Sequence, residues 1–271
     1  MLNDPFAKLE GPLAGTTRMR LEVVENRPLT PAMQQVVLSA PELAGFGYRP
    51  GQDVMLMVAV DGDRPVRRRY TIRDTDPARC LLTLGIVRHD GGPGERWVAE
   101  ARPGDELEGI GPRGKIFPVE GAAWHLFAGD FSALPAFFAM AGSLPAGQRA
   151  IVIQEVPGPG DEQELAAAAD VEVAWVHADG RPPGDPAALA GALAAMPLPP
   201  GAGHAYLAGE ARLCWRCARP WRRAGCPGTR YHRRPTGGWG GPTPPTASPP
   251  GTVSVRTGSR PASRPAARGP R

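Results

Sequence analysis

The stretch WHLFAGDFSALPAFFAMAGSLP, residues 124–145, decides the fold, because the hydrophobic pattern of the chain changes there. Residues 124–129 form a short, mainly apolar run, which is typical of a strand buried on both faces of a parallel sheet. A loop follows at Asp130, and the apolar segment from Ser132 to Pro145 predicts a helix. Strand, loop and helix together predict a βα unit and hence the start of an α/β domain.

The residues before this stretch alternate between apolar and polar side chains, as antiparallel strands do. Six segments carry the pattern and are separated by turn residues such as Pro103-Gly104: residues 18–27, 33–40, 52–60, 67–74, 80–89 and 105–114. The sequence therefore predicts an N-terminal antiparallel β-barrel over residues 16–120.

The residues after this stretch contain three more short apolar runs, at 149–156, 171–179 and 204–211, and a helical segment at 186–197. We interpret the runs as buried parallel strands, so an α/β nucleotide-binding domain is expected over residues 121–213. The acidic residues Asp161, Glu162 and Glu164 are interpreted as a solvated loop that leads into a helix.

The composition of the 271 residues, 42% hydrophobic and 21% charged, is that of a globular protein. No apolar run approaches the length of about 18 residues that a membrane span needs, and the first residues lack the basic end and apolar core of a signal peptide. We therefore expect a cytoplasmic protein without a membrane span.

Residues 214–271 differ in composition from the rest of the chain. They contain 12 Arg, 11 Pro and 9 Gly, with no Lys, Asp, Glu, Leu, Ile, Met or Phe. The other 213 residues hold 19 of the 31 basic residues and all 27 acidic ones, a net charge of −8. The overall charge of +4 therefore comes from this tail, and no nucleic-acid partner is expected. A disordered, low-complexity C-terminal tail is predicted, because it has too little apolar surface to fold.

The first group of residues with chemical meaning is the segment Arg68-Arg69-Tyr70-Thr71-Ile72-Arg73. On a strand, Arg68, Tyr70 and Ile72 share one face, and the residues between them share the other. A flavin needs an aromatic ring, a hydroxyl near its reactive nitrogen and a cation for its diphosphate, which Tyr70, Thr71 and Arg68 can supply. The alternative is a basic, partly solvated edge strand.

The second group is the glycine-rich loop HDGGPGERW, from His89 to Trp97, which leads into a predicted short helix. Amide groups at a helix N-terminus favour a diphosphate, and glycine allows a ligand to approach the backbone. The alternative is an ordinary loop between a strand and a helix.

The third group is Gly129 to Pro135, which follows the first strand of the predicted α/β domain. The carboxyl end of such a strand is where a nucleotide cofactor usually binds. The segment has no GxGxxG motif, so it differs from the ordinary dinucleotide-binding fingerprint.

In this order and spacing the motifs resemble those of the siderophore-interacting protein family, the flavin-dependent ferric-siderophore reductases of the wider ferredoxin-reductase-like group. That family shows R-x-Y-T-x-R, a His followed by a Gly-Pro segment and a Trp, P-G-D with G-P-x-G, G-D-x-(S/T)-A-L-P-A, and A-G-E. The corresponding residues are Arg68 to Arg73, His89 to Trp97, Pro103 to Asp105 with Gly111 to Gly114, Gly129 to Ala136, and Ala208 to Glu210.

The resemblance implies a FAD held on the barrel, NADPH or NADH docked on the α/β domain, and a ferric siderophore that is reduced to release Fe(II) for iron assimilation. For FAD it implies contacts from Arg68, Tyr70, Thr71, Ile72, Arg73, His89, Gly92, Pro93, Gly94 and Trp97. For the nicotinamide cofactor it implies Asp130, Ser132, Ala133, Leu134, Pro135, Gly209 and Glu210. Arg67 and Arg69 are candidates for acceptor binding. No catalytic side chain and no metal site are expected, and a monomer is expected.

Two other functions stay open at this point. The same scaffold can serve as a general flavin reductase or ferredoxin-type reductase, with a different electron acceptor. It can also bind flavin without turnover, because the family's last helix and its K-x-Y-W-x-x-G segment are missing after Ala208-Gly209-Glu210. Their loss would expose apolar surface of the α/β domain.

The tail itself has three interpretations. We hypothesise that the residues from about Cys214 are an out-of-frame translation of a GC-rich gene, because shifted codons for residues 214–239 can encode an amphipathic helix and a K-A-Y-W-G segment. A zinc site formed by Cys214, Cys217, Cys226 and His232 is the second interpretation. The third is a solvated tail without function, which is favoured over nonspecific binding of the Arg-rich residues to nucleic acid or anionic surfaces.

Overall fold

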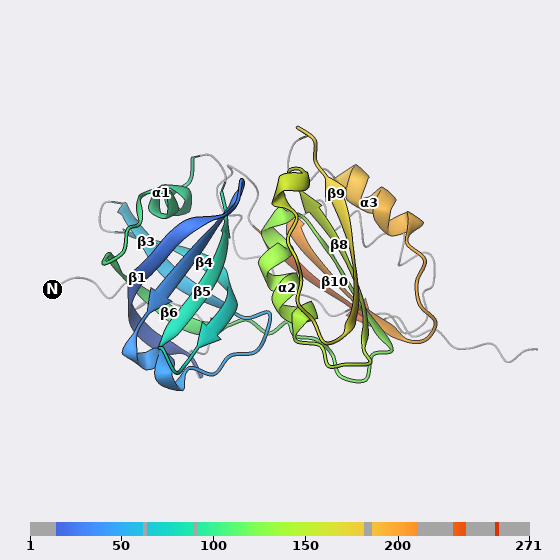
Figure 1. Cartoon of the computed structure of the whole chain (residues 1–271), viewed down its shortest axis with the longest axis horizontal. Helices are drawn as coiled ribbons and strands as arrows, with labels where there is room; N and C mark the ends of the chain where they lie inside the picture. Colours follow the sequence, from blue (N-terminus) through green and yellow to red (C-terminus); the bar gives the residue numbers. More distant parts are fainter. Residues whose placement is uncertain are drawn as a thin grey trace, which may run out of the picture.

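The computed structural model describes residues 15–61, 64–88, 91–181, 186–210, 230–236 and 253–254. Figure 1 shows two domains side by side, an antiparallel barrel from the first half of the chain and a layered α/β domain from the second. This arrangement confirms the fold class predicted from the sequence. Within the described residues, no helix has the length and apolar character that crossing a membrane requires.

The barrel is closed by six antiparallel strands in the order β1-β2-β5-β4-β3-β6. Their bounds are Thr17–Thr30 for β1, Met33–Ser39 for β2, Asp53–Asp61 for β3, Arg64–Asp76 for β4, Leu81–Val87 for β5 and Glu106–Arg113 for β6. A short 3-10 helix, η1 (Pro41–Gly45), follows β2. Helix α1 (Pro93–Glu100) follows β5 and lies at one end of the barrel in Figure 1.

The inside of the barrel is filled by the apolar side chains that alternate along its strands. Leu21, Leu38, Leu56 and Leu84 are fully buried there. Gly109 of β6 lies beside two of them, because a Cβ at this position would be 2.6 Å from Leu21 Cδ1 and 2.9 Å from Leu56 Cδ2. A larger residue would force these side chains apart, so the glycine allows the core to close.

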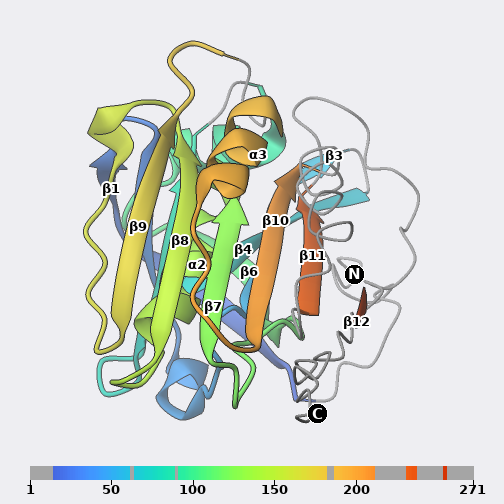
Figure 2. The same ribbon diagram turned by 90° about the vertical axis from the view of Figure 1, so that its right-hand side faces the viewer.

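The second domain is a mainly parallel sheet with helices on both faces, seen face-on in Figure 2. The strand order is β12-β11-β10-β7-β8-β9. The elements up to β10 are β7 Trp124–Gly129, η2 Phe131–Ala133, α2 Leu134–Gly142, β8 Arg149–Val156, η3 Pro159–Asp161, β9 Asp170–His177, α3 Pro186–Ala195 and β10 Gly203–Glu210. Helix α2 lies between the sheet and the barrel, and α3 covers the opposite face.

Two short strands lie in the segment for which the sequence predicts no folded element. Strand β11 (Arg230–Thr236) pairs in parallel with β10, and β12 (Val253–Ser254) pairs antiparallel with β11. The rest of the predicted tail lies outside the described residues. Backbone hydrogen bonding explains the unexpected strands, because the free edge of β10 can take a partner strand whose side chains are not apolar.

The two domains share a hydrophobic cluster at their junction. Met33 of the barrel is fully buried in one cluster with Phe131, Leu134 and Phe137 of the α/β domain. Asp161 also lies at this junction and is only 4% exposed, and no helix follows it, which corrects the expectation of a solvated acidic loop before a helix. Its carboxylate accepts hydrogen bonds from barrel residues 129 and 131 positions away, a pairing that the local sequence does not reveal.

Candidate active site

Strand β4 places Arg68 and Tyr70 against the first turn of helix α1. A Cβ added to Gly94 would lie 2.6 Å from Tyr70 Oη and 3.1 Å from Arg68 Cγ. Gly92 is the N-cap of the helix, and Pro93 occupies its first position, where the missing amide costs no helical hydrogen bond. The structure therefore brings the R-x-Y-T-x-R strand and the glycine-rich loop together.

Aromatic packing fixes the ring of Tyr70. Its centroid lies 5.9 Å from that of Trp97, with the two ring planes at 30°, and both side chains pack against the barrel core. Burial raises the pKa of the Tyr70 hydroxyl well above its usual range; Arg68 lowers it and Glu95 raises it further. The hydroxyl therefore stays neutral, and Tyr70 offers an aromatic surface beside a cation.

Tyr70, Arg68 and the first turn of α1 fit the ring and the diphosphate of a flavin dinucleotide. Arg68 is exposed, and its Nη1 donates to the Arg67 carbonyl oxygen at 2.9 Å. A guanidinium carries five N–H groups, so Arg68 retains donors for a phosphate. The first turn of α1 lies directly beside this side chain, and the positive end of a helix also favours a phosphate. An aromatic ring, a guanidinium and a helix N-terminus are thus contiguous.

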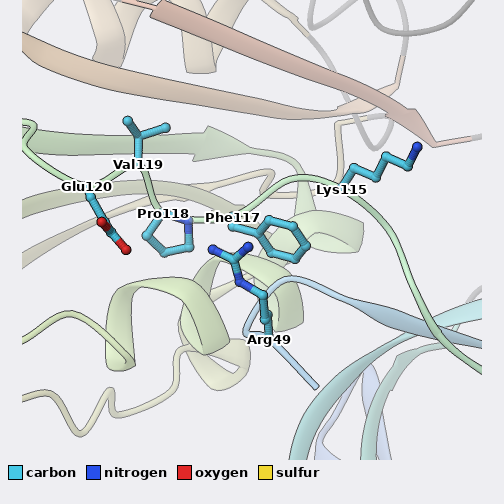
Figure 3. A pocket seen from close by; sticks show the side chains of 6 residues that line it. All are labelled: Arg49, Lys115, Phe117, Pro118, Val119 and Glu120. Carbon is cyan, nitrogen blue, oxygen red and sulfur yellow. The ribbon is translucent and has the colours of Figure 1, made fainter. Parts of the chain in front are cut away.

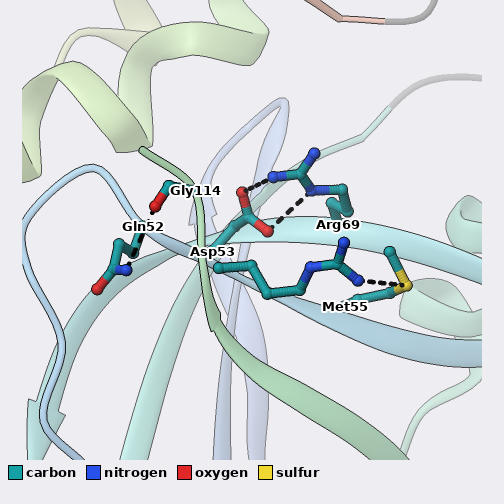
Figure 4. A network of polar contacts seen from close by, with 6 residues as sticks. Gln52, Asp53, Met55, Arg69 and Gly114 are labelled. Atoms are coloured by element: carbon teal, nitrogen blue, oxygen red, sulfur yellow. Dashed lines mark hydrogen bonds and ion pairs between the residues drawn. The ribbon is translucent and has the colours of Figure 1, made fainter. Parts of the chain in front are cut away.

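The opposite face of β4 carries a buried charge network, drawn in Figure 4. Asp53 of β3 is fully buried and accepts hydrogen bonds from Arg69 at 2.9 Å to Oδ1 and 2.6 Å to Oδ2. Arg113 donates to Met55 Sδ at 3.4 Å. Burial and then the nearby Arg69 lower the pKa of Arg113, while Asp53 raises it. Arg69, which the sequence proposes for acceptor binding, is therefore first of all the partner of a buried carboxylate.

Thr71 lies next to this network in the strand register. It faces Asp53 across the β3–β4 ladder and is half-buried. Thr71 therefore lies on the same face of the sheet as Asp53, and Tyr70 lies on the other face. The predicted contact of Thr71 with a flavin stays a prediction.

Ile72 shares the inward face of β4 with Tyr70, whereas Arg73 lies on the opposite face. The side chain of Ile72 is fully buried in the barrel core, so it can offer a cofactor only its backbone. The β4–β5 ladder is irregular between Ile72 and Asp74, and Arg73 Nη1 donates to Gln163 Oε1 at 2.8 Å across the domain junction. Burial lowers the pKa of Arg73, which Asp74 raises. The FAD contacts predicted for Ile72 and Arg73 stay predictions, and the strand pattern alone shows neither the barrel core nor the contact with the other domain.

In the α/β domain, Asp130 shapes the loop after β7. Its side chain is 2% exposed, and its Oδ1 accepts from Ser132 N at 3.0 Å and from Ser132 Oγ at 2.5 Å. Gly209 of β10 packs against this carboxylate with a φ of +134°, a conformation that favours glycine. The loop and the A-G-E motif thus meet at the carboxyl edge of the sheet, where nucleotides bind in α/β proteins.

The other predicted nicotinamide contacts differ in accessibility. The side chains of Ala133, Leu134 and Pro135 are buried where α2 begins, so their backbone groups are what a nucleotide could reach. The backbone of Glu210 pairs with β11, and its side chain lies outside the described residues. His89 also lies outside the described residues. The roles predicted for His89 and Glu210 stay predictions.

A cavity of about 290 Å³ borders the linker between the two domains and was not foreseen from the sequence (Figure 3). The guanidinium carbon of Arg49 lies 3.8 Å from the centroid of the Phe117 ring, a cation–π contact. The linker is fixed on the sheet, because Val119 N donates to the Tyr206 hydroxyl at 2.7 Å. The lining residues are Arg49, Lys115, Phe117, Pro118, Val119 and Glu120. In the sequence, the signal for this cavity was the pair of basic residues Arg49 and Lys115, which lie beside the turns at Pro50-Gly51 and at Gly114.

Metal binding finds no support in the part of the chain that the structure describes. No group of three or more His, Cys, Asp or Glu side chains lies close enough there to hold a metal ion. Three members of the zinc interpretation, Cys214, Cys217 and Cys226, lie outside the described residues. Of the fourth, His232, only the backbone in β11 is described.

The fold defines a class of protein, one with a closed antiparallel barrel followed by a mainly parallel α/β domain, as in ferredoxin reductases. Sequence comparison is more specific. The sequence model of the siderophore-interacting FAD-binding domain matches residues 58–116, and that of the siderophore-interacting protein matches residues 122–233. The chain belongs to the siderophore-interacting protein family.

Several relatives support this assignment. An uncharacterised protein of Mycobacterium tuberculosis is 33% identical over 242 residues, which cover 78% of this chain and 86% of the relative. The ferric vibriobactin reductase ViuB of Vibrio cholerae is 29% identical over 212 residues, which cover 70% of this chain and 78% of the relative. The NADPH-dependent ferric-chelate reductase of Escherichia coli is 31% identical over 135 residues, which cover 43% of this chain and 53% of the relative.

A solved structure agrees with the sequence comparison. The crystal structure of a siderophore utilization protein from T. fusca superposes with a TM-score of 0.72 at 30% identity, covering 82% of this chain and 94% of that chain. Two of these relatives are named as reductases, one of ferric vibriobactin and one of a ferric chelate.

Proposed function

We propose that this protein is a FAD-dependent ferric-siderophore reductase that oxidises NAD(P)H. One observation carries the proposal: strand β4 lies against the candidate FAD-binding helix at Tyr70 and, three residues further on, lies near the candidate nicotinamide loop at Arg73. Tyr70 lies against Gly94 of α1, while Arg73 and Pro135 both lie near Gly85, within 3.6 Å of where its Cβ would be. A strand in this position can bring an electron donor and a flavin together.

The FAD side is built from the barrel. Arg68 and the first amides of α1 bind the diphosphate, and Tyr70 packs its ring against the isoalloxazine. The bound flavin supplies the chemistry of accepting a hydride and giving up single electrons. The neutral Tyr70 hydroxyl and the apolar side of Trp97 limit access of water to this face.

The nicotinamide side is built from the loop after β7. Asp130 is buried and uses its carboxylate to hold Ser132 in place, so it orders the loop rather than acting on the substrate. Gly209 makes room for the Asp130 carboxylate at the carboxyl edge of β10, the edge where nucleotides bind in α/β proteins. The name of the Escherichia coli relative makes NADPH the first donor to test.

The acceptor side is built from cations on the outer face of β3, β4 and β6. Arg67, Arg69 and Arg113 lie close enough to influence one another electrostatically, beside the buried Asp53. We assign to this face the attraction of an anionic ferric siderophore, with Arg69 oriented by Asp53. One NAD(P)H gives two electrons and a proton; two Fe(III) ions each take one electron, and one proton is released.

The test is anaerobic reduction of a ferric siderophore by the purified, FAD-loaded protein. Ferric catecholate and hydroxamate siderophores, free flavin and a ferredoxin are each offered with NADPH or NADH, and Fe(II) is trapped with a coloured chelator. We expect Fe(II) to form fastest from a ferric siderophore. Faster reduction of free flavin or ferredoxin would contradict the proposed substrate, and absence of FAD binding would contradict the proposed cofactor.

A further inference from the structure

The junction between the domains contains a buried carboxylate that links them by hydrogen bonds. Asp161, at the end of η3, is 4% exposed. Its Oδ1 accepts from Thr30 Oγ1 at 2.6 Å and from Ala32 N at 2.8 Å. Thr30 and Ala32 flank the turn between β1 and β2, so an α/β-domain carboxylate holds the tip of a barrel hairpin.

A second polar contact lies two residues further along the chain. The Gln163 side chain accepts from Arg73 Nη1 at 2.8 Å and donates to Met33 Sδ at 3.4 Å. Met33 is fully buried, whereas Arg73 and Gln163 are half-buried, so both contacts are partly shielded from water. Asp161 and Gln163 together touch two separate parts of the barrel, the β1–β2 turn and the end of β4.

The Gln163 contact lies at the place where the two proposed cofactor sites approach each other. A Cβ added to Gly85 would be 3.5 Å from Pro135 Cγ and 3.6 Å from Arg73 Nη1. Arg73 is on the strand that carries Tyr70, and Pro135 ends the loop that begins at Asp130. A shift of the barrel against the α/β domain would therefore change the distance between these sites.

We propose that Asp161 and Gln163 form an interdomain latch that positions the nicotinamide loop relative to the flavin strand. This inference rests on the proposed function. The apolar contacts of α2 hold the domains together but are not directional, whereas hydrogen bonds to a buried carboxylate fix one relative position. Hydride transfer is sensitive to displacements of about 1 Å, so Asp161 and Gln163 are positioning residues for that step.

The experiment compares the purified protein with the variants Asp161→Ala and Gln163→Ala. A matched control is Glu162→Gln, because Glu162 is exposed and its carboxylate contacts His177 of its own domain at 2.7 Å. FAD and NADPH affinities are measured by fluorescence, and anaerobic bleaching of the flavin at saturating NADPH is measured by stopped flow. Amide hydrogen exchange at Ala32 reports whether the hydrogen bond from Ala32 N to Asp161 is intact, and this measurement needs no turnover.

We expect Asp161→Ala to slow bleaching by about tenfold or more while both affinities stay within about twofold. Exchange at the Ala32 amide should become faster by about tenfold in this variant and should not change in Glu162→Gln. Gln163→Ala should slow bleaching less, because Met33 stays buried by apolar contacts. Unchanged bleaching in Asp161→Ala would overturn the proposal.

Two further variants keep the test decisive if Asp161→Ala does not fold. Thr30→Val removes one donor without changing the shape of the side chain, and Asp161→Asn keeps an acceptor oxygen. Bleaching that is slower than wild type in Thr30→Val or in Asp161→Asn supports the latch; wild-type rates in both overturn it. If the wild-type protein binds FAD but is not bleached by NADPH, the proposed function fails. The latch is then decided by whether Ala32 exchange rises in Thr30→Val and not in Glu162→Gln.

Discussion

The two halves of strand β4 make a useful comparison. The half that carries Arg68 and Tyr70 packs against α1, an element of its own domain. The half that carries Ile72 and Arg73 enters the barrel core and reaches Gln163 of the other domain. A single strand therefore serves cofactor binding at one end and domain arrangement at the other. Substitutions in the first half should change the affinity for FAD, and substitutions in the second half should change the rate of its reduction.

The largest effect is expected at Gly94, where helix α1 approaches the first half of the strand. Gly94→Val places a branched side chain where a Cβ would already be 2.6 Å from Tyr70 Oη. The ring and the helix must separate, so FAD affinity should fall by about 100-fold or more. Fluorescence titration of the apoprotein with FAD measures this affinity. Gly191→Val is the control, because nothing lies within 4 Å of a Cβ there. Equal affinity in both variants would contradict the placement of FAD.

A smaller loss of affinity is expected when the aromatic ring of Tyr70 is removed. Tyr70→Ala should weaken FAD binding by about tenfold, because the isoalloxazine loses its aromatic partner. Tyr70→Phe keeps the ring and should bind FAD within about threefold of the wild-type protein. Titration with FAD compares the three proteins. Equal losses in the Ala and Phe variants would show that the ring does not contact the flavin.

The second half of the strand should show the opposite pattern. Arg73→Ala removes the contact with Gln163 without touching the face of Tyr70. FAD affinity should stay within about twofold, while bleaching by NADPH should slow by about three- to tenfold. Titration and stopped-flow absorbance measure the two quantities on the same preparation. A large loss of FAD affinity with normal bleaching would show that Arg73 binds the cofactor directly.

The smallest expected effect is on the pH dependence of the free energy of unfolding. Burial raises the pKa of Tyr70 above the ordinary value of 10.0, so the folded protein resists ionisation of this hydroxyl. This stabilisation is complete below pH 10 and is lost as the pH rises from there toward the folded-state pKa. The free energy of unfolding should therefore fall less steeply above pH 10 in Tyr70→Phe than in the wild-type protein. Urea titrations at several pH values measure this slope, and equal slopes would contradict burial of the hydroxyl.

The barrel and the α/β order could be predicted because their signals are local. The alternation along β4 and the apolar run of β7 are visible within a few residues. The meeting of Tyr70 with Gly94 was also predictable, since both lie in motifs with a shared chemical purpose. Strand β11 was not, because its pairing depends on the free edge of β10 and not on its own side chains.

The polar contacts that join distant parts of the chain were the part that sequence could not show. Asp161 looks like one of several acidic loop residues, and its burial depends on a hairpin 129 residues away. Arg69 and Arg73 look equivalent on a basic strand, yet one pairs with Asp53 and the other with Gln163. Long-range pairing of this kind depends on tertiary structure, which residue patterns do not encode locally.

The most direct test of the whole account is the visible spectrum of the FAD-loaded protein under anaerobic conditions, before and after NADPH is added. We expect a flavin absorption band that bleaches on addition, because β4 joins the FAD site to the nicotinamide loop. A flavin band that persists at saturating NADPH and NADH would contradict that claim, since the cofactor would then bind to the barrel without access to a donor.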